Sequence, residues 1–333
     1  MPSRLKALIQ YVVILLATVF LIWFSLRSIT LQEGENKWDY IFEAWRLADK
    51  RWLVVMAVFA ILSHIVRAMR WKMLVEQTGH PVTLTSSFLS LMVGYLVNLV
   101  IPRGGEVSRC YNLYKLDRAP VEVSFGTVVV ERIVDLICLL LLIILAFVLE
   151  SGRLLSFVET LPLDFSAAGG KMLFLLLLAG VLALVGALGY WLVRRSPKLS
   201  AFFTKTWKGM KSGLLSVFRL KNKGLFVFQS ALIWVLYFFM SYAVLKAFQT
   251  TSHLGFSAVI SLFGIGSIAM AAPLPGGTGA YHVLVPQGLS FLYGLELQDA
   301  VALTFVFHGW QTFIMIMGGA LSLIITSIIS KKP

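Results

Sequence analysis

Three charged residues stand close together in an otherwise apolar stretch of the sequence. Glu131, Arg132 and Asp135 lie within residues 121–149, which are numerous enough to cross a bilayer as one helix. On such a helix Glu131 and Asp135 are four residues apart and share a face. Each charge at the centre of a span costs about 2.5–3.5 kcal/mol on insertion scales. These side chains should therefore avoid lipid. They either form structural ion pairs or line a hydrated substrate path.

Other charged residues could pair with these three or bind an anion. Arg67 and Arg70 are three residues apart beside Trp71, where they could anchor the membrane interface or grip a lipid phosphate. A second group surrounds a Pro/Gly break and comprises Asn98, Arg103, Glu106 and Arg109. We predict that five charged residues converge on one cavity: Arg103, Arg109, Glu131, Arg132 and Asp135.

A third group of candidates is uncharged. The glycine-rich segment 276–279 could hold an anion through backbone N–H groups at a helix start. It lacks the Lys-Ser/Thr ending of a nucleotide-binding loop, so we exclude ATP there. Polar side chains in apolar helices either join helices or line a path, and we interpret His64 as packing. The remaining candidates for substrate binding are Gly276, Gly277, Gly279, His282, His308 and Gln311.

The composition places these residues in a membrane protein. Of 333 residues, 58% are hydrophobic and 14% are charged, against about 45–50% and about 25% in soluble domains. Two cysteines are too few to suggest a zinc or redox site. We assign the net charge of +13 to basic loops at anionic headgroups rather than to nucleic acid. No catalytic motif is present, so an enzyme is the less favoured class, and we expect no cofactor and no metal.

The apolar stretches predict an all-α, polytopic membrane protein with about eight membrane segments, forming one integral domain over residues 1–333. Basic residues favour the cytoplasmic side. The loop 194–223 carries nine basic residues and no acidic one. We therefore expect this loop and both termini on the cytoplasmic side, and we expect the protein in the plasma membrane. Simple spans are expected at 7–26 (a retained segment rather than a signal peptide), 52–69, 121–149, 172–193, 224–246 and 299–329.

Two further segments should be broken or re-entrant. If 121–149 runs outward, residues 86–118 must begin and end on the cytoplasmic side. Residues 247–295 contain no Asp, Glu, Lys or Arg and must likewise enter and leave. Each segment has a Pro/Gly break, at 102–105 and 273–279, and broken backbone at membrane depth must be sheltered or wet.

We therefore predict that the two breaks lie close together within the membrane and line one headgroup path. Repeat-built transporters use paired, interrupted segments in this way. The similarity between the two breaks is short, so an internal repeat is a hypothesis. The alternative for the second break is a tight external turn, because Pro-Gly-Gly is also good turn chemistry.

In order and spacing, the motifs resemble the transmembrane region of lysylphosphatidylglycerol synthases, and more closely the stand-alone proteins that consist of this region only. The resemblance covers residues 5–330. It rests on four motifs: Arg67-x-x-Arg70-Trp71, Asn98-x-x-x-Pro102-Arg103-x-Gly105-Glu106-x-x-Arg109, Glu131-Arg132-x-x-Asp135 and Pro275-Gly276-Gly277-x-Gly279. The resemblance implies movement of aminoacylated phospholipids, or of other anionic lipid or lipid-carrier headgroups, between leaflets. Family members commonly have Glu where this chain has His282, which leaves the lipid class open.

Three functions follow for testing. The favoured one is a lipid translocase, in which the arginines attract phosphate and Glu131 and Asp135 balance their charge or contact amines and hydroxyls. With no ATP motif, transport would be downhill or coupled to an ion gradient, with Glu131, Asp135 or His282 as proton carriers. The alternatives are a membrane enzyme acting on a lipid-linked substrate and a non-transporting partner of an envelope-synthesis enzyme. Expected partners are membrane lipids, a second copy or such an enzyme, and no nucleic acid.

Overall fold

The computed structural model describes residues 16, 18–27, 29, 36–149, 207–270, 272 and 274–330. Within these ranges the chain is helical and has no strand. A short apolar helix, Thr18–Arg27, comes first. The other elements are α2 (Lys37–Leu47), α3 (Lys50–Glu76), α4 (Leu84–Asn98), α5 (Gly105–Asp117), α6 (Val121–Leu149), η2 (Leu215–Arg219), α10 (Lys223–Ala247), α11 (Phe256–Met270), η3 (Pro275–Gly277), α12 (Ala280–Tyr293) and α13 (Leu297–Ile329).

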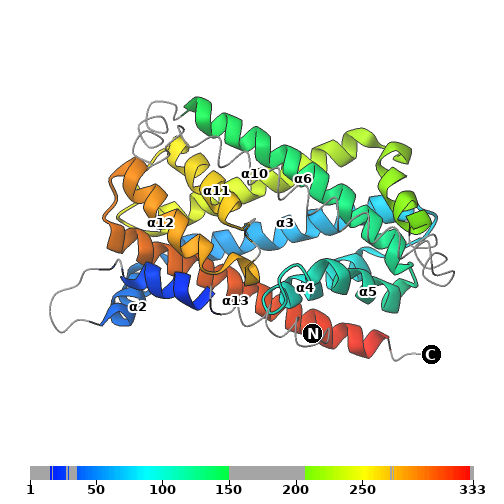
Figure 1. The fold of residues 1–333 in the computed structure, drawn as a ribbon, viewed down its shortest axis with the longest axis horizontal. Helices are drawn as coiled ribbons and strands as arrows, with labels where there is room; N and C mark the ends of the chain where they lie inside the picture. Colours follow the sequence, from blue (N-terminus) through cyan, green and yellow to red (C-terminus); the bar gives the residue numbers. More distant parts are fainter. Residues whose placement is uncertain are drawn as a thin grey trace, which may run out of the picture.

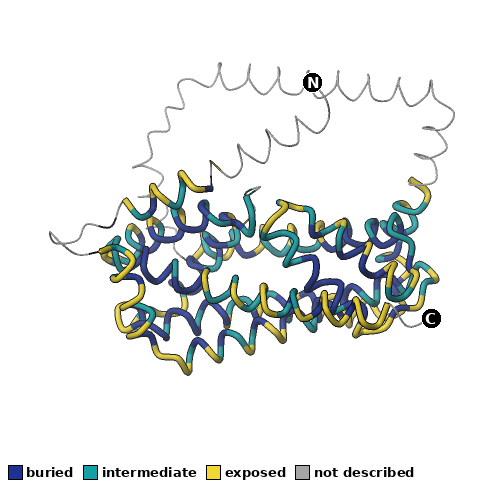
Figure 2. The backbone as a smooth tube through the Cα atoms, turned by 90° about the horizontal axis from the view of Figure 1, so that it is seen from below, coloured by how far each residue is buried: buried dark blue, intermediate teal, exposed yellow. Residues whose placement is uncertain are grey.

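The long helices have the length and composition of membrane spans. Three of them, α3, α10 and α13, are apolar enough to cross a bilayer. Exposed residues run along the outer sides of the helices and buried residues face inward (Figure 2), and many of the exposed ones are large and apolar. This confirms the predicted class, a polytopic helical membrane protein. The predicted span 172–193 lies outside the described residues, as do residues 7–15 and 17 of the first predicted span and residues 194–206 of the basic loop.

Helices α4 and α5 form an antiparallel hairpin. The hydroxyl of Ser86 donates to Asp117 at 2.8 Å, and the amide of Asn112 donates to Ser90 at 3.1 Å, so early residues of α4 face late residues of α5. The two helices have 15 and 13 residues. Each is therefore about 20 Å long, shorter than the hydrocarbon core of about 30 Å. Within residues 84–117 the chain runs into the bundle and back to the same end, which is the shape that the sequence predicted for this segment.

Helices α11 and α12 form a second hairpin of the same kind. Tyr293 near the end of α12 hydrogen-bonds Ser261 near the start of α11 at 2.8 Å. The tip contains the short turn η3, where Gly276 and Gly277 have φ of 56° and 72°. Glycine adopts this left-handed backbone without a steric penalty, which explains why the tip of this hairpin is glycine-rich.

The two hairpins occupy equivalent places in an inverted arrangement. The order long helix, hairpin, long helix occurs twice, as α3–α4–α5–α6 and as α10–α11–α12–α13. The first helices of the two halves run antiparallel, since Phe59 stacks on Phe239 and Trp52 contacts Tyr242. Each hairpin packs on the last helix of the other half, α4 on α13 and α11 on α6. Figure 1 shows the hairpins at opposite ends of the bundle, with α13 running past both. This is the architecture of an inverted internal repeat.

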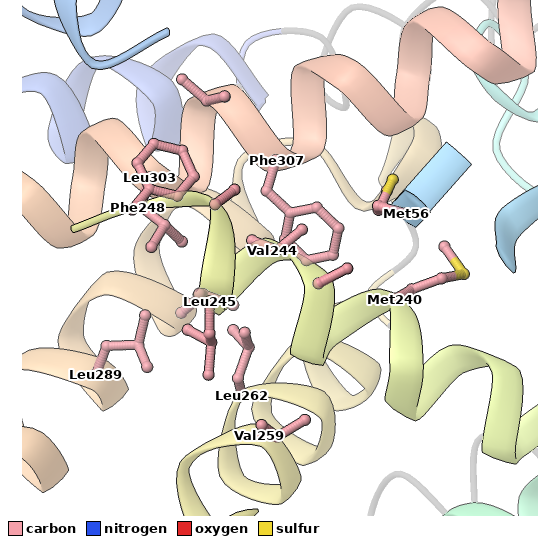
Figure 3. Close-up of a cluster of buried hydrophobic side chains, with 14 of the residues drawn as sticks. Met56, Met240, Val244, Leu245, Phe248, Val259, Leu262, Leu289, Leu303 and Phe307 are labelled. Carbon is pink, nitrogen blue, oxygen red and sulfur yellow. The ribbon is translucent and has the colours of Figure 1, made fainter. Parts of the chain in front are cut away.

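The main apolar core belongs to the second hairpin. Figure 3 shows its side chains converging from α3, α10, α11, α12 and α13. The labelled residues are Met56, Met240, Val244, Leu245, Phe248, Val259, Leu262, Leu289, Leu303 and Phe307. A smaller cluster with Trp71, Cys110, Leu113 and Val128 lies beneath the first hairpin. Among the described residues, the buried charged side chains come from α3, α5 and α6, namely Arg67, Arg70, Arg109 and Glu131.

Candidate functional site

A network of buried ion pairs joins α3, α5 and α6. Asp135 accepts from Arg67 and from Arg70, each at 2.8 Å. Glu131 accepts from Arg109 at 2.7 Å and lies 3.4 Å from Arg70. Glu131 and Arg70 are completely buried, and the other two arginines nearly so. The structure thus brings together Arg109, Glu131 and Asp135 from the predicted cavity, and adds the two arginines of α3.

Polar residues from α10 complete the network. Arg70 Nη1 donates to Ser230 Oγ at 3.1 Å, and Arg67 Nη2 donates to the hydroxyl of Tyr237 at 3.1 Å. The sequence analysis missed both partners. Their signal is present, since Ser230 and Tyr237 are polar, lie in an apolar helix and are seven residues apart, which places them on one face.

Trp71 contacts both α6 and the Arg109 guanidinium of the network. Its indole N–H donates to Thr127 Oγ1 on α6 at 2.9 Å, which ties α3 to α6. The guanidinium of Arg109 lies over the Trp71 ring, 4.7 Å from its centroid. This stacking fixes the plane of the guanidinium. Its Nη2 atom then points to Glu131, while Nε and Nη1 have no hydrogen-bond partner among the described residues.

The network has an excess of positive charge. With Arg132 and Glu106 at its edge, four guanidinium groups face three carboxylates. The buried part alone has three arginines for Glu131 and Asp135. Among the described residues this buried positive charge is therefore only partly neutralised, and an excess of positive charge favours the binding of an anion.

A small pocket of about 10 Å³, room for about one water molecule, opens beside this network between α4, α5 and α6. Arg132 is the most exposed residue of its wall, with 47% of its side chain accessible, so it lies at the mouth. It is 3.9 Å from Glu106 and 3.6 Å from Asp135, and both distances exceed that of a normal hydrogen bond. The wall consists of Leu91, Gly94, Tyr95, Asn98, Gly105, Glu106, Arg109 and Arg132.

Close helix contact shapes the floor of this pocket. A Cβ atom on Gly105 would lie 2.1 Å from the carbonyl oxygen of Gly94, so only glycine allows α4 and α5 to approach this closely. Asn98 ends α4 and accepts a hydrogen bond from the Gly105 N–H at 2.7 Å. The predicted candidate Asn98 is therefore both a pocket residue and a cap for the first turn of α5.

Arg103 is placed differently from the prediction. It lies in the connection between α4 and α5 with an exposed side chain, and it is not part of the pocket wall described above. Its φ of 61° is unusual for a residue with a side chain. This backbone conformation turns the chain at the tip of the hairpin. The position of Arg103 next to Pro102 did not reveal the direction of that turn.

The uncharged candidates gather at the tip of the second hairpin. His308 Nε2 lies 3.0 Å from the carbonyl oxygen of Gly276, and the Gly279 N–H donates to His282 Nδ1 at 3.3 Å. The two imidazole rings are 4.9 Å apart. Gln311 follows one turn later on α13. These contacts join the tip to α13.

Two further residues, the candidate Gly277 and the packing residue His64, have structural surroundings of their own. Gly277 is so close to Met270 that a Cβ atom would lie 2.4 Å from its Sδ atom. His64 packs against the ring of Tyr95, with centroids 4.7 Å apart. Whether any of the candidates binds substrate stays a prediction.

The two hairpin tips touch. A Cβ atom on Gly276 would lie 2.8 Å from Leu99 Cδ2, and Leu99 follows directly after α4. The two breaks are therefore neighbours in space although they are distant in sequence. A path that passes one tip also passes the other.

Comparison with known proteins identifies relatives across most of the chain. The family model for the lysylphosphatidylglycerol synthase TM region matches residues 8–319. A UPF0104 membrane protein of Methanothermobacter thermautotrophicus is 26% identical over 268 residues, 72% of this chain and 75% of that protein. A UPF0104 membrane protein of Methanocaldococcus jannaschii is 30% identical over 100 residues, 29% of this chain and 30% of that protein.

One relative carries a functional name. The glycosyltransferase AglD of Haloferax volcanii is 22% identical over 308 residues. The match covers 83% of this chain but 49% of that protein, so the chain spans about half of AglD. No solved structure matches.

Proposed function

Because the chain belongs to the family of the lysylphosphatidylglycerol synthase TM region, we propose that it moves a phosphate-bearing lipid headgroup between membrane leaflets. One observation carries the proposal. Arg109 is buried beside the pocket between α4, α5 and α6 and has two nitrogen atoms without a partner among the described residues. A phosphate offers several oxygen acceptors to such a group.

The position of the pocket supports transport. It lies against the broken hairpin α4–α5, whose tip touches the tip of α11–α12. Interrupted segments that meet from opposite ends build the substrate site in repeat-built transporters. The chain contains no nucleotide-binding loop in the glycine-rich segment, so movement is downhill or coupled to an ion gradient.

A second candidate concerns the lipid rather than the mechanism. AglD is named as a glycosyltransferase, and this chain aligns to about half of it. A lipid-linked carrier headgroup is therefore the second candidate substrate, with an envelope-synthesis enzyme as a possible partner. A second copy of the chain is another candidate partner. We place the protein in the plasma membrane with both termini in the cytoplasm, on the strength of the basic loop 194–223.

The test separates a binding role of the network from a structural one. The double variant Arg109→Gln/Glu131→Gln removes one positive and one negative charge and keeps similar volume. Neutralising both partners of a buried pair has little effect on stability compared with removing one. In proteoliposomes with acyl-chain-labelled phospholipids, we expect the initial translocation rate to fall by about tenfold or more, while the protein stays folded.

The matched control is Lys72→Gln/Glu76→Gln, which neutralises the partly exposed pair on α3 whose atoms are 2.7 Å apart. This control should translocate at the native rate. Native translocation in the Arg109→Gln/Glu131→Gln variant would show that the network is purely structural, and the proposal would fail.

A further inference from the structure

The chain that leads into α10 forms a strongly basic surface. Residues 207–214 are helical and continue directly into η2, and α10 begins four residues after η2 ends. Figure 1 shows this part of the chain, in yellow-green, at the end of the bundle where α5 leads into α6. Residues 207–223, which we call the basic segment, contain five cations and no acidic residue. All five are exposed, namely Lys208, Lys211, Arg219, Lys221 and Lys223.

The positive charge of the basic segment is not neutralised by the rest of the described chain. None of the five cations has an ion-pair partner among the residues that the structure describes. On the helical part, Lys208 and Lys211 are three residues apart and share a face. The other three cations lie within five residues of one another, from Arg219 to Lys223. The surface therefore presents a concentrated positive charge to whatever lies beside it.

The basic segment is held firmly against the bundle. A Cβ atom on Gly126 of α6 would lie 2.4 Å from the carbonyl oxygen of Met210, so the two backbones are in close contact. Further along, Leu220 is buried in an apolar cluster with Leu74 of α3. The cations are therefore displayed from a backbone that α3 and α6 hold in place.

The start of α10 sets the depth of these cations in the membrane. Helix α10 is long and apolar enough to cross a bilayer. Its residues Val227 and Phe228 are 65% and 60% exposed, so they face acyl chains. Lys223 stands four residues before Val227, about 6 Å along the helix axis. Because lysine side chains extend their ammonium groups toward the polar layer, Lys223 and the cations just before it reach the level of the lipid phosphates.

Exposed aromatic side chains lie among the cations. Trp207 is 56% exposed and Phe218 is 73% exposed. Trp207 shares a helix face with Lys211, and Phe218 directly precedes Arg219. Aromatic rings beside Lys and Arg suit the membrane interface, where the rings lie at the acyl boundary and the cations meet phosphates. A soluble acidic partner would match the cations, but it would have to displace lipid from both rings.

The opposite end of the bundle has similar apolar surface but lacks this charge. Residues 37–51 lead into α3 as the basic segment leads into α10, and α3 and α10 run antiparallel. This stretch contains four cations and three carboxylates, hence a net charge of +1, against +5 for the basic segment. It also presents an aromatic ring, since Phe42 is 62% exposed. The two ends therefore differ in charge rather than in apolar character.

We propose that the basic segment binds anionic phospholipid headgroups in the leaflet that it faces, such as those of phosphatidylglycerol or cardiolipin. The five cations contact the phosphates, while Trp207 and Phe218 lie in the interface. One cation at an anionic membrane surface strengthens association by about fivefold. Several cations on a fixed backbone therefore select anionic over zwitterionic lipid. The inference concerns the lipids that surround the protein and holds whether or not the protein translocates any of them.

The experiment measures the lipid preference separately at each end of the bundle. A single cysteine replaces Phe218 or Phe42 in a background without Cys110 and Cys138, and it carries a bimane label. The proteoliposomes contain one fixed mixture of phosphatidylglycerol and phosphatidylcholine, in which either the first or the second lipid is brominated. Quenching then gives the relative association of the two lipids. At position 218 we expect a preference for phosphatidylglycerol of at least about fivefold at low salt, and at position 42 no preference.

Two matched variants assign the preference to its residues. Arg219→Gln/Lys221→Gln/Lys223→Gln should lower the preference at position 218 by about fivefold or more. Arg46→Gln/Lys50→Gln/Arg51→Gln removes three cations at the other end and should leave the preference at 218 unchanged. Raising the salt concentration to about 0.5 M should weaken the preference in the native protein, because ions screen the exposed charges. The melting temperature of each variant in detergent verifies that it is folded.

Each contrary outcome overturns a defined part of the inference. Equal quenching by the two lipids at position 218 of the native protein would overturn the preference itself. An equal preference at positions 218 and 42 would show that it does not belong to this end. A preference that survives the variant of residues 219, 221 and 223 would assign it to other residues. Quenching at 218 by aqueous iodide, but by neither brominated lipid, would place the segment in water and make a soluble acidic partner its occupant.

Discussion

Arg70 is the most constrained residue of the charged network. It is completely buried and contacts Asp135, Glu131 and Ser230. Two of these partners carry a negative charge, so Arg70 neutralises carboxylates from two successive turns of α6. Arg67 makes a direct ion pair with only one of these carboxylates, that of Asp135. At the scale of single residues, Arg70 should therefore matter most for stability.

We predict that Arg70→Met lowers the free energy of unfolding by about 1.5–3 kcal/mol, because buried partners lose their hydrogen bonds from a cation. The loss is limited because Arg67 still pairs with Asp135 and Arg109 still pairs with Glu131. Thermal or denaturant unfolding in detergent measures the change. The control is Lys72→Met, two residues further on, which removes a partly exposed ion pair and should cost less than about 1 kcal/mol. If the two variants lose the same stability, Arg70 does not hold the network together.

The sequence could predict that these charges meet, but not how they pair. Charges in an apolar helix must avoid lipid, and that argument needs no coordinates. Arg67 and Asp135 are 68 residues apart, and Arg70 and Asp135 are 65 apart. Which of them meet depends on the rotation of α3 against α6, which the Trp71–Thr127 hydrogen bond helps to set. Arg103 departs from the prediction that it lines the cavity, because the backbone turn at its own position directs its side chain to the surface.

At the scale of elements, the first hairpin depends on the contact between Gly94 and Gly105. Their closeness lets the backbones of α4 and α5 come together where these helices line the pocket. In membrane proteins, helix association relies on such close packing more than on exclusion of water. A methyl group at this contact cannot be absorbed by a flexible side chain, because the obstructing atom belongs to the backbone.

We predict that Gly105→Ala separates α4 from α5, lowers the melting temperature and abolishes translocation. Gly264→Ala is the control. Gly264 is a helical glycine of the other hairpin, and a Cβ atom there has no neighbour within 4 Å. The control should keep native stability and activity. Thermal unfolding followed by light scattering, together with the translocation assay, distinguishes the two; a fully active Gly105→Ala variant would contradict the packing argument.

The existence of both hairpins and the closeness of the two breaks could be predicted from the sequence, whereas the particular residues that meet there could not. Loop charge and the Pro/Gly breaks indicated that 86–118 enters and returns, and the uncharged length of 247–295 indicated a second such element. Helices α4 and α11 have 15 residues each, too few to cross the hydrocarbon core in one pass, which agrees with this prediction. The meeting of Leu99 with Gly276 depends on how the two halves dock, and no local pattern encodes that.

At the scale of the whole molecule, the hairpins enter from opposite ends of α13. Asn112 near the base of the first hairpin donates to Thr326 near the end of α13 at 3.2 Å. The base of the second hairpin continues into the start of α13 through residues 294–296. Because α13 is long enough to cross the membrane, the two bases should lie on opposite sides.

We predict that single cysteines at positions 84 and 118 react with a membrane-impermeant reagent from one side, and cysteines at 255 and 294 from the other. The background variant replaces Cys110 and Cys138. The physical reason is that Thr83 and Asp117 are joined by a hydrogen bond of 2.7 Å at the base of the first hairpin. Labelling of 84 and 118 from opposite sides would contradict the hairpin. Labelling of all four from one side would contradict the inverted arrangement.

The inverted repeat also has a consequence for the history of the chain. If the two halves descend from one ancestral half, that half had to insert into the membrane in either orientation and pair with an oppositely oriented twin. Arg132 and His308 are each the twelfth residue of the last helix of their half, and Asp135 and Gln311 are each the fifteenth. Equivalent positions are thus ionic in one half and neutral in the other, a difference that two identical subunits could not show.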